Sequence, residues 1–429
     1  MSFDSRPSHA SGKRILIATF GSLGDLHPYL AIAKELKSRG HRPLIVTLDR
    51  YREAVEGEGI EFTVMRPLES QLGSPEEVVR RVIHPRKGPV YLIRRVVMPF
   101  VREGYEDLFR AAAGADLLVS HPITFALPLV AEKRGIPWVS TVLSPMSFFS
   151  SHDPSVIPAA PWLHLLRRLG IGPYRWIFGL AKAVSASWEK PLHDLRAEIG
   201  LPPSKKVAMF EGQFSPRLNL ALFSRWLAEP QPDWPANTEI CGFAHYDGRP
   251  SSAVSGELKT FLAAGEAPIV FTLGSSVSMD PGDFFQKALE AANRLGRRAV
   301  LITGSLPSDD IDESEHLKVF PYLPYSEVFP YASVVVHPGG IGTTAQALAA
   351  GRPMLVTPAA FDQPDNARRA ARLGIARVVP FRKVTSRVLQ RNIAELAADR
   401  RYADRAAQMG ERLRGENGAK RACDLLEKS

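Results

Sequence analysis

Cysteine is nearly absent from this sequence: the 429 residues include only Cys241 and Cys423. Two isolated cysteines form neither a disulfide framework nor a metal-binding cluster, and this usage is typical of proteins in a reducing compartment. The histidines are dispersed along the chain as well. We therefore expect a cytoplasmic protein that does not require a bound metal.

Long apolar runs are missing too. No run of about eighteen apolar residues occurs, so we expect no membrane-spanning helix. The opening residues, MSFDSRPSHASGK, are polar and lack the apolar centre of a signal peptide, which indicates a loose leader. With 45% apolar and 23% charged residues, the chain has the composition of a globular protein and is long enough for two domains.

Acidic residues are fewer than basic ones, and the net charge is +9. Nucleic-acid-binding proteins are often this basic, but here the arginines and lysines are scattered, and no dense basic block alternates with aromatic residues. We therefore expect no nucleic-acid partner. A basic surface also attracts anionic small molecules or an anionic membrane face, so peripheral membrane contact stays open.

The most informative stretch runs from residue 334 to residue 366, VVVHPGGIGTTAQALAAGRPMLVTPAAFDQPDN. It predicts a buried strand at 334–336, a glycine turn, a helix over 345–350 that ends at Gly351, and a second strand at 354–356. Glycines let backbone approach a ligand closely, and a helix N-terminus favours phosphate. Thr343 and Thr344 can donate to such a phosphate or simply cap the helix, so this turn alone leaves both interpretations open.

A polar pair after the second strand favours the ligand interpretation. Asp362 and Gln363 follow the strand at 354–356 and should lie at its carboxyl end. In an open parallel sheet, this edge is where ligands bind. The pair would therefore lie beside the phosphate site, where it can bind the hydroxyls of a polar ligand.

This stretch resembles the donor-binding signature of the glycosyltransferase-B superfamily. More narrowly, it is similar to the bacterial branch that includes the rhamnolipid rhamnosyltransferase and the sterol and macrolide glucosyltransferases, and the resemblance covers nearly the whole chain. It implies an α/β fold with two doubly wound Rossmann-like domains that face each other across a cleft. It also implies that the glycine turn holds the diphosphate of a nucleotide sugar and that Asp362 and Gln363 bind the sugar hydroxyls.

The resemblance assigns further residues to the donor site. Tyr322 takes the position of the ring that stacks on the nucleotide base. The other expected donor-binding residues are Ser275, Ser276, Leu323, His337, Gly340, Gly342, Thr343 and Thr344. One departure concerns the phosphate contact: many relatives carry two histidines before the glycines, whereas this chain has His337-Pro338. Either His337 substitutes for the second histidine or that contact is missing.

Two similar openings divide the chain into halves. A strand at 14–20, a turn at Gly21 and a helix over 29–39 open the first half, and a strand at 268–273, a turn at Gly274 and a helix over 281–295 open the second. Further strands are expected at 43–48, 116–120, 136–142, 219–223 and 298–303. We predict an N-terminal acceptor-binding domain over 1–243, a linker over 244–255, a C-terminal nucleotide-sugar-binding domain over 256–395, and a helical segment over 396–429 that packs back on the first domain.

The segment 144–188 is rich in aromatic and aliphatic residues in what reads as loop sequence. It contains Phe148, Phe149, Trp162, Leu165, Leu166, Tyr174, Trp176 and Phe178. Each one taken singly fits ordinary core packing. Together they indicate a hydrophobic acceptor pocket, with Phe148 and Phe149 as its expected acceptor-binding residues.

Inverting transfer needs a base for the acceptor hydroxyl, and three residues qualify. Asp25 occupies the place of the base in the resembled glycopeptide and sterol enzymes, while the plant relatives carry a histidine there. His121 matches the plant aspartate that orients that histidine, so the pair looks exchanged, and either member can lie nearest the hydroxyl. His27 is the third candidate. Asp25 can also be a helix cap, and His27 and His121 can be structural.

We therefore predict an inverting, metal-independent glycosyltransferase that has no cofactor beyond its nucleotide-sugar co-substrate. The donor is a UDP- or dTDP-hexose, with glucose and rhamnose both open. The acceptor is a small lipophilic hydroxyl compound of the phenolic or flavonoid, hydroxy-fatty acyl or sterol-like class. The alternatives are a nucleotide-sugar epimerase of the same architecture and a non-catalytic nucleotide-sugar-binding protein.

Overall fold

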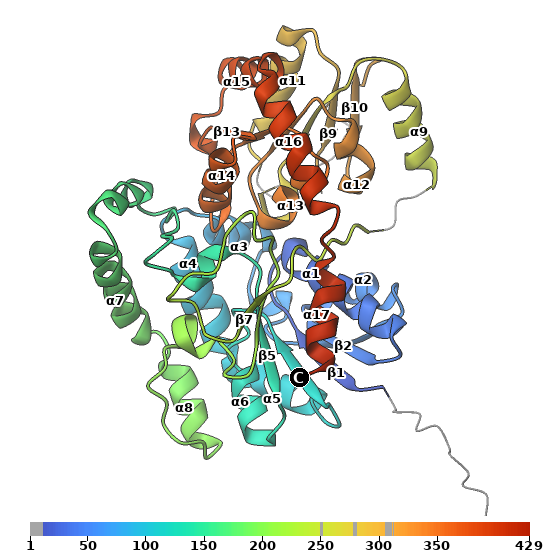
Figure 1. Ribbon diagram of the computed structural model, residues 1–429. Helices are drawn as coiled ribbons and strands as arrows, with labels where there is room; N and C mark the ends of the chain where they lie inside the picture. Colours follow the sequence, from blue (N-terminus) through green and yellow to red (C-terminus); the bar gives the residue numbers. More distant parts are fainter. Residues whose placement is uncertain (1–11, 249–251, 278–280, 305–310, 312) are drawn as a thin grey trace, which may run out of the picture.

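The computed structural model describes residues 12–248, 252–277, 281–304, 311 and 313–429. They form two α/β units, each built on one parallel sheet that helices flank (Figure 1). This is the architecture that the sequence predicts. The N-terminal unit lies below the C-terminal unit in Figure 1, and the red C-terminal helix α17 returns to the lower one.

The N-terminal sheet has seven parallel strands in the order β3-β2-β1-β4-β5-β6-β7. Its central strands are continuous apolar runs because helices cover both faces of such a sheet. The strands are β1 (Arg14–Ala18), β2 (Arg42–Thr47), β3 (Glu61–Val64), β4 (Leu117–Ser120), β5 (Trp138–Val142), β6 (Asn219–Ala221) and β7 (Thr238–Ile240).

The C-terminal sheet repeats this order with six parallel strands, β10-β9-β8-β11-β12-β13. They are β8 (Ile269–Thr272), β9 (Ala299–Ile302), β10 (Leu317–Phe320), β11 (Val334–His337), β12 (Met354–Val356) and β13 (Ala376–Val378). The strand order reverses between β1 and β4 in one sheet and between β8 and β11 in the other. Ligands bind at such switch points, outside the carboxyl ends of the strands.

Helices lie between most successive strands of the two sheets. In the N-terminal unit they are α1 (Leu23–Ser38), α2 (Arg52–Glu56), α3 (Pro75–Val82), α4 (Gly88–Tyr91), α5 (Val101–Ala111), α6 (Leu127–Arg134), α7 (Gly172–Ala186) and α8 (Lys190–Glu198). In the C-terminal unit and the end segment they are α9 (Ser252–Ala263), α10 (Gly274–Val277), α11 (Phe284–Leu295), α12 (Tyr325–Val328), α13 (Ile341–Ala349), α14 (Gln363–Arg372), α15 (Ser386–Ala398), α16 (Arg400–Leu413) and α17 (Gly418–Glu427).

The shorter 3₁₀ and π turns fill the connections. They are η1 (Asp49–Tyr51), η2 (Glu69–Gln71), η3 (Leu92–Val97), η4 (Met98–Phe100), η5 (Pro145–Phe148), η6 (Pro161–Leu169), η7 (Ala208–Gly212), η9 (Phe329–Tyr331) and η10 (Phe381–Lys383). Within the described residues, no helix is long and apolar enough to cross a membrane.

The end of the chain packs on both units. Helix α16 lies against α13 of the C-terminal unit, where Gly410 is so close to Gly351 that a methyl group at either position would meet backbone, and its last turn places Arg412 over the Trp226 ring of the N-terminal unit at 4.6 Å. Helix α17 then crosses to the N-terminal unit. There the thiol of Cys423 faces the carbonyl oxygen of Ile32 at 3.5 Å, and Asp424 pairs with Arg39 at 2.7 Å.

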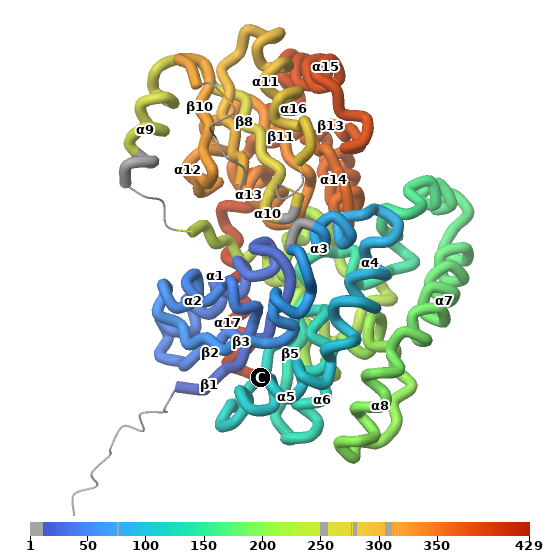
Figure 2. The backbone as a smooth tube through the Cα atoms, turned by 180° about the vertical axis from the view of Figure 1, so that it is seen from behind, coloured from blue at the N-terminus to red at the C-terminus, as the bar shows by residue number. Residues whose placement is uncertain are grey.

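Polar contacts join the two units beside the switch points. Arg369 of α14 is 2% exposed and binds Asp153 of the N-terminal unit, with 2.5 Å between Nη1 and Oδ2. Asp365 accepts a 3.0 Å hydrogen bond from the backbone N–H of Val156. Helix α1 packs against α10 and α13 (Figure 2). The loops after β1 and β4 therefore lie close to the loops after β8, β11 and β12.

Candidate functional site

Asp25 lies in the first turn of α1, directly after the central strand β1. Helix α1 begins at Leu23, six residues before the predicted start at Tyr29, because the Asp25 carboxylate caps its first turn. Oδ2 of Asp25 accepts the backbone N–H of Ser22 at 2.7 Å and the Ser22 hydroxyl at 3.0 Å. Asp25 is thus a helix cap, but this bonding occupies only one of its carboxylate oxygens.

The second oxygen of Asp25 faces His121, which follows β4 across the switch point. Oδ1 lies 3.3 Å from Nε2 of His121. The other ring nitrogen of His121 accepts the backbone N–H of Ile123 at 3.3 Å, so a neutral ring carries its proton on Nε2 and donates to Asp25. The side chain of His121 is 6% exposed and that of Asp25 is 33% exposed. Of the pair, Asp25 is the member that solvent and a substrate can reach.

The environment keeps Asp25 ionised. Burial acts to raise the pKa of Asp25, but the hydrogen bond from His121, together with the Ser22 donors, holds the pKa below the ordinary aspartate value. Behind the pair, the Tyr29 ring lies edge-on to His121 with 6.1 Å between ring centroids. The hydroxyl of Tyr29 is 2.5 Å from that of Thr141. These contacts limit the orientations open to the imidazole.

His27 lies away from this pair. It is two positions from Asp25, which turns it about 200° around the helix axis. Its ring packs edge-on against Tyr246 with 5.1 Å between centroids, and burial lowers its pKa to about 4. The structure therefore pairs Asp25 with His121 and places His27 apart from them.

Replacing His27 with glutamine is expected to leave the rate of sugar transfer within about threefold of wild type, because a general base would contribute about 10²- to 10⁴-fold. Steady-state kinetics with saturating donor would measure the effect. A loss of about a hundredfold with normal donor affinity would show that His27, and not Asp25, takes the proton.

The glycine turn after β11 combines one strained position with two open ones. Gly339 has φ +90, and a methyl group there would lie 2.6 Å from Cγ1 of Val356. Gly340 and Gly342 differ, because an added Cβ at either would meet no atom within 4 Å beyond its chain neighbours and its own helix backbone. Neither needs to be glycine for packing, so their missing side chains leave free space at the N-terminus of α13. That space, with N–H groups facing it, suits a phosphate.

The polar residues around this turn are deeply buried. His337 is 0% exposed, its Nδ1 accepts the N–H of Gly339 at 3.1 Å, and burial lowers its pKa to about 3, so the ring is neutral. Nε2 of His337 and the hydroxyl of Thr344 have no hydrogen-bond partner among the described residues. Thr343 is buried as well, and its hydroxyl bonds with Tyr325. These groups reach a ligand only if it seats closely in the turn.

Asp362 occupies the N-cap position of α14, where its side chain makes no capping hydrogen bond. It is tied to the glycine turn through a residue that the sequence analysis did not single out. Nδ2 of Asn366 donates to Oδ2 of Asp362 at 2.7 Å and to the carbonyl oxygen of Gly339 at 3.0 Å. The amide oxygen of Asn366 lies 3.4 Å from the hydroxyl of Ser144 in the other unit. Only the amide-after-aspartate spacing on a helix, four residues apart, could have pointed to it.

Gln363 has a different position from its neighbour. Its side chain is 2% exposed, and its amide oxygen accepts the N–H groups of Ala359 and Ala360 at 2.9 and 3.0 Å. These bonds hold the turn in which Phe361 adopts a positive φ of 51. Gln363 thus shapes the loop that presents Asp362, and only its amide nitrogen is left for a ligand.

Replacing Asp362 with asparagine is expected to stabilise the free protein above neutral pH. Burial raises the pKa of Asp362 to about 7, and the charge of Asp25 adds to this although Asn366 opposes it. The folded pKa thus lies above the unfolded value of about 3.9, so the folded state loses stability as the pH rises from about 4 to about 7. The variant lacks this loss.

Urea unfolding across this pH range would measure the difference. The free energies of unfolding of the variant and the wild type should agree near pH 4 and diverge in favour of the variant toward pH 8, about one unit above the Asp362 pKa. A wild-type protein that is the more stable of the two at high pH would contradict the buried, uncompensated position of Asp362.

The side chains of the remaining donor-site candidates differ in how far they are exposed to a ligand. Tyr322 is 42% exposed, and its hydroxyl accepts the N–H of Gly248 at 2.9 Å, so its ring has a free face for stacking. Leu323 is 2% exposed and can contact a ligand only through its backbone. Ser275 is half-buried in α10, after β8, whereas the side chain of Ser276 lies outside the described residues.

The expected acceptor residues lie in a separate hollow. Phe148 is 5% exposed and stacks on Trp234 at 4.1 Å, while Phe149 stacks on Phe210 at 4.5 Å. Both line a hollow of about 590 Å³ whose walls include Phe178 but neither Asp25 nor His121. Trp162, Leu165 and Trp176 face solvent, because the segment forms η6 and α7 and not the expected loops. An acceptor role for Phe148 and Phe149 stays a prediction.

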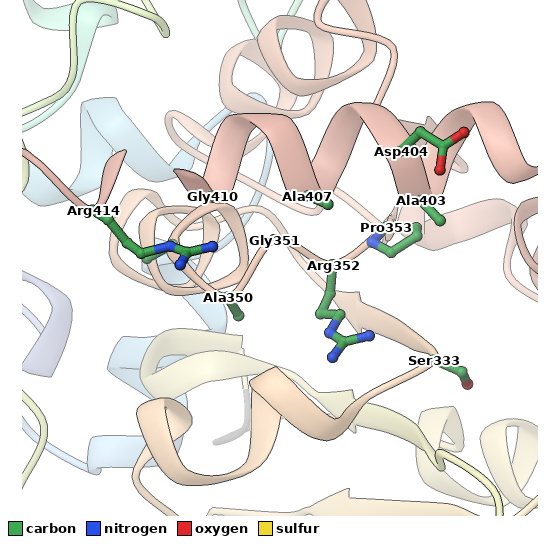
Figure 3. Close-up of a pocket in the computed structure, with 11 residues that line it drawn as sticks. Ser333, Ala350, Gly351, Arg352, Pro353, Ala403, Asp404, Ala407, Gly410 and Arg414 are labelled. Atoms are coloured by element: carbon green, nitrogen blue, oxygen red, sulfur yellow. The ribbon is translucent and has the colours of Figure 1, made fainter. Parts of the chain in front are cut away.

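A second hollow of about 400 Å³ lies between α13 and α16, at the opposite end of the strands from the glycine turn (Figure 3). Gly351 and Pro353 line it at the start of β12, and Figure 3 shows Arg352 and Arg414 beside it. It is too remote to form part of the site. Within the described ranges, no group of three or more His, Cys, Asp or Glu residues is placed to hold a metal ion.

Fold and site together define a class of protein. Two doubly wound units bring their switch points together, one with an ionised carboxylate paired to histidine and the other with an open glycine turn at a helix N-terminus. This is the arrangement of a GT-B transferase, in which one unit holds a nucleotide-activated group and the other presents the acceptor.

Comparison with known proteins agrees. The family model described as glycosyltransferase family 28 N-terminal domain matches residues 15–96, and the one described as erythromycin biosynthesis protein CIII-like, C-terminal domain matches residues 304–420. The chain is 31% identical to the O-mycaminosyltylonolide 6-deoxyallosyltransferase of Streptomyces fradiae, over 96% of this chain and 97% of that protein.

Two further similarities are more distant. A sterol 3-beta-glucosyltransferase of Leptosphaeria maculans is 27% identical, over 96% of this chain and 28% of that longer protein. The structure of the spinosyn rhamnosyltransferase SpnG complexed with thymidine diphosphate has a TM-score of 0.67 at 16% identity, covers 96% of this chain and all of that one (100%), and shares its fold. The chain belongs to the glycosyltransferases of the GT-B fold and is a glycosyltransferase.

Proposed function

We propose that the protein transfers a hexose from a dTDP- or UDP-sugar to a hydroxyl group of a small lipophilic acceptor, with inversion and without a metal ion. The observation that carries this proposal is the Asp25–His121 pair, at 3.3 Å, on the unit that faces the glycine turn. The charge of Asp25 contributes to raising the pKa of Asp362 in the opposite unit, which supports a site that both units share.

Asp25 is the proposed base and His121 its positioning partner. The acceptor oxygen attacks the anomeric carbon while its proton moves to Asp25, and the bond between that carbon and the diphosphate breaks. His121 donates from Nε2 to the carboxylate, and its other nitrogen is already bonded to Ile123. This bonding, and the 6% exposure of His121, favour Asp25 over His121 as the group that contacts the hydroxyl.

The departing nucleoside diphosphate is proposed to sit in the open space at Gly340 and Gly342. Free N–H groups and the positive end of the α13 dipole would stabilise its charge, which removes the need for a cation. Asp362 would then accept hydrogen bonds from sugar hydroxyls. The pKa of Asp362 is about 7 in the free protein, and hydrogen bonds from sugar hydroxyls would lower it, because they favour the ionised form. Such hydroxyls would therefore stabilise the Asp362 carboxylate.

A dTDP-deoxyhexose is the first donor to test. The relative with 31% identity is named for a 6-deoxyallosyl group, and the SpnG structure holds thymidine diphosphate. UDP-glucose is the second, because the sterol relative is named a glucosyltransferase. For the acceptor, the first of these names points to a glycosylated macrolactone and the last to a sterol, both lipophilic alcohols.

The proposed reaction can be tested with dTDP-rhamnose and UDP-glucose against a panel of macrolactones, sterols and phenols in the presence of EDTA. We expect acceptor-dependent release of one nucleoside diphosphate, and a product whose anomeric configuration by NMR is opposite to that of the donor. Retention of configuration would contradict the proposed direct displacement. Conversion of the donor to another sugar nucleotide without acceptor would instead support the epimerase alternative.

A further inference from the structure

The outer face of η6 and α7 is unusually apolar for a surface. Eleven large hydrophobic side chains are exposed among the described residues, and seven of them belong to this one segment. We call them the outer apolar face: Trp162, Leu165, Leu169, Ile171, Trp176, Leu180 and Val184. Trp176 is 70% exposed and Trp162 62%. A patch of this kind on a protein surface marks an interaction site.

Helix α7 is apolar on both of its faces. Tyr174 and Phe178 point inward and are buried, as a core-facing stripe requires. Trp176, Leu180 and Val184 follow each other at four-residue intervals, so they form a second stripe on the solvent side. A globular protein normally places polar residues on that side. Both views show α7 at the outer edge of the N-terminal unit, where no other helix covers it (Figures 1 and 2).

The charged side chains of the segment that carries the outer apolar face are all basic. No aspartate or glutamate occurs from residue 154 to residue 188. Arg167, Arg168 and Arg175 are exposed, and none of the three forms an ion pair within the described part of the chain. Lys182 is the exception, since it pairs with Glu211. The segment therefore offers tryptophan, leucine and unpaired arginine together.

Exposed apolar side chains together with unpaired arginines favour one kind of partner for the outer apolar face over another. In a twofold dimer, the same patch would meet itself, and the three arginines of one copy would lie against those of the other. Like charges so placed oppose association. An anionic lipid surface satisfies both features at once, because headgroup phosphates pair with arginine while tryptophan and leucine enter the interfacial layer.

We propose that the outer apolar face docks the protein onto an anionic lipid surface. Helix α7 then lies in the plane of the interface, with the Trp162 and Trp176 rings among the headgroups and Arg167, Arg168 and Arg175 against the phosphates. This proposal does not depend on the donor or acceptor named above. It does specify where a lipophilic acceptor would first meet the enzyme, since the hollow lined by Phe149 and Phe178 borders α7.

The test is co-sedimentation of the full-length protein with vesicles of phosphatidylcholine, with and without phosphatidylglycerol. We expect binding to the anionic vesicles, with the apparent affinity reduced about tenfold or more in the Trp162→Ser/Trp176→Ser variant and likewise in the Arg167→Gln/Arg168→Gln/Arg175→Gln variant. High salt should weaken the wild type but have little further effect on the arginine variant. Tyr331→Ser, a change at a side chain that is 57% exposed elsewhere, is the matched control and should bind like wild type.

Three results would overturn the proposal. One is equal binding to vesicles with and without phosphatidylglycerol. The second is wild-type binding by both patch variants, whose melting temperatures should be unchanged because the replaced side chains are exposed. The third is a concentration-dependent dimer that the tryptophan variant abolishes, because the outer apolar face would then be occupied by a second copy. A shift of tryptophan emission to shorter wavelength with anionic vesicles, lost in the tryptophan variant, would support it.

Discussion

Replacing Asp25 with asparagine is expected to lower kcat for sugar transfer by about 10²- to 10⁴-fold, the range that a general base contributes. The affinity for the nucleoside diphosphate should stay within about twofold, because Asp25 belongs to the acceptor side of the site. Asparagine keeps the shape and one acceptor oxygen, so the cap on the Ser22 N–H survives. Pre-steady-state transfer with saturating donor would measure the loss. An undiminished rate would remove Asp25 as the base.

Two further variants separate the role of Asp25 from the roles of the residues that donate hydrogen bonds to it. Ser22→Ala removes one donor to Asp25 but leaves the carboxylate and should cost little activity. His121→Asn removes the partner whose hydrogen bond holds the Asp25 pKa down. The acid limb of its pH–rate profile should therefore shift to higher pH, because Asp25 then binds its proton more readily. A merely structural histidine would lower the rate without moving that limb.

Replacing Gly340 with valine is expected to weaken binding of the donor diphosphate by about a hundredfold or more. Gly340 has φ −57 and ψ 144, which any residue adopts, and a Cβ there meets no atom of the chain. The fold should tolerate the change at a cost of about 1 kcal/mol, since glycine is the better residue at an N-cap. The added methyl groups would occupy the space assigned to the diphosphate. Calorimetric titration with dTDP and UDP would measure the effect.

A substitution at Gly339 is expected to have the opposite effects on stability and ligand binding. Gly339→Ala forces a Cβ to within 2.6 Å of Val356 at φ +90, so we expect a loss of unfolding free energy of about 2–4 kcal/mol. Gly340→Val should therefore lose ligand and keep stability, whereas Gly339→Ala should lose stability first. If Gly340→Val bound dTDP as tightly as wild type, the open space at α13 would not be the donor site.

The sequence predicts the framework of the site because a few strong local signals coincide with it. The runs at 14–20 and 334–336 are buried strands at the two switch points, and the glycine turns after them are where backbone must bend sharply. Once these strands are parallel, Asp25, His121, Gly340 and Asp362 come to the same edges of the two sheets. Topology thus brings the loops of Asp25 and His121 together, whereas their pairing is what the family resemblance implies, and the structure places Oδ1 and Nε2 3.3 Å apart.

Other features had no such signal. Strands β3, β7, β10 and β13 were not predicted; each is three or four residues long and carries polar positions, and the sheet that accepts them fixes their conformation. The early start of α1 depended on the Asp25 cap, and the link from Asn366 to Gly339 spans 27 positions in the chain. The position of Trp176 depends on which face of α7 packs inward. Because both faces carry apolar residues, the sequence pattern does not show which one that is.

The account depends most on the claim that the glycine turn of the C-terminal unit binds a nucleoside diphosphate. Calorimetric titration of the wild-type protein with dTDP, UDP, dTDP-rhamnose and UDP-glucose, in the presence of EDTA, tests this directly. We predict that one nucleoside diphosphate, and the nucleotide sugar with the same base, bind saturably at one site per chain. If none of the four bound, with EDTA or with added magnesium, the donor site proposed at Gly340 and Asp362 would be contradicted. Pro338→His, beside His337, would then be the first variant to test.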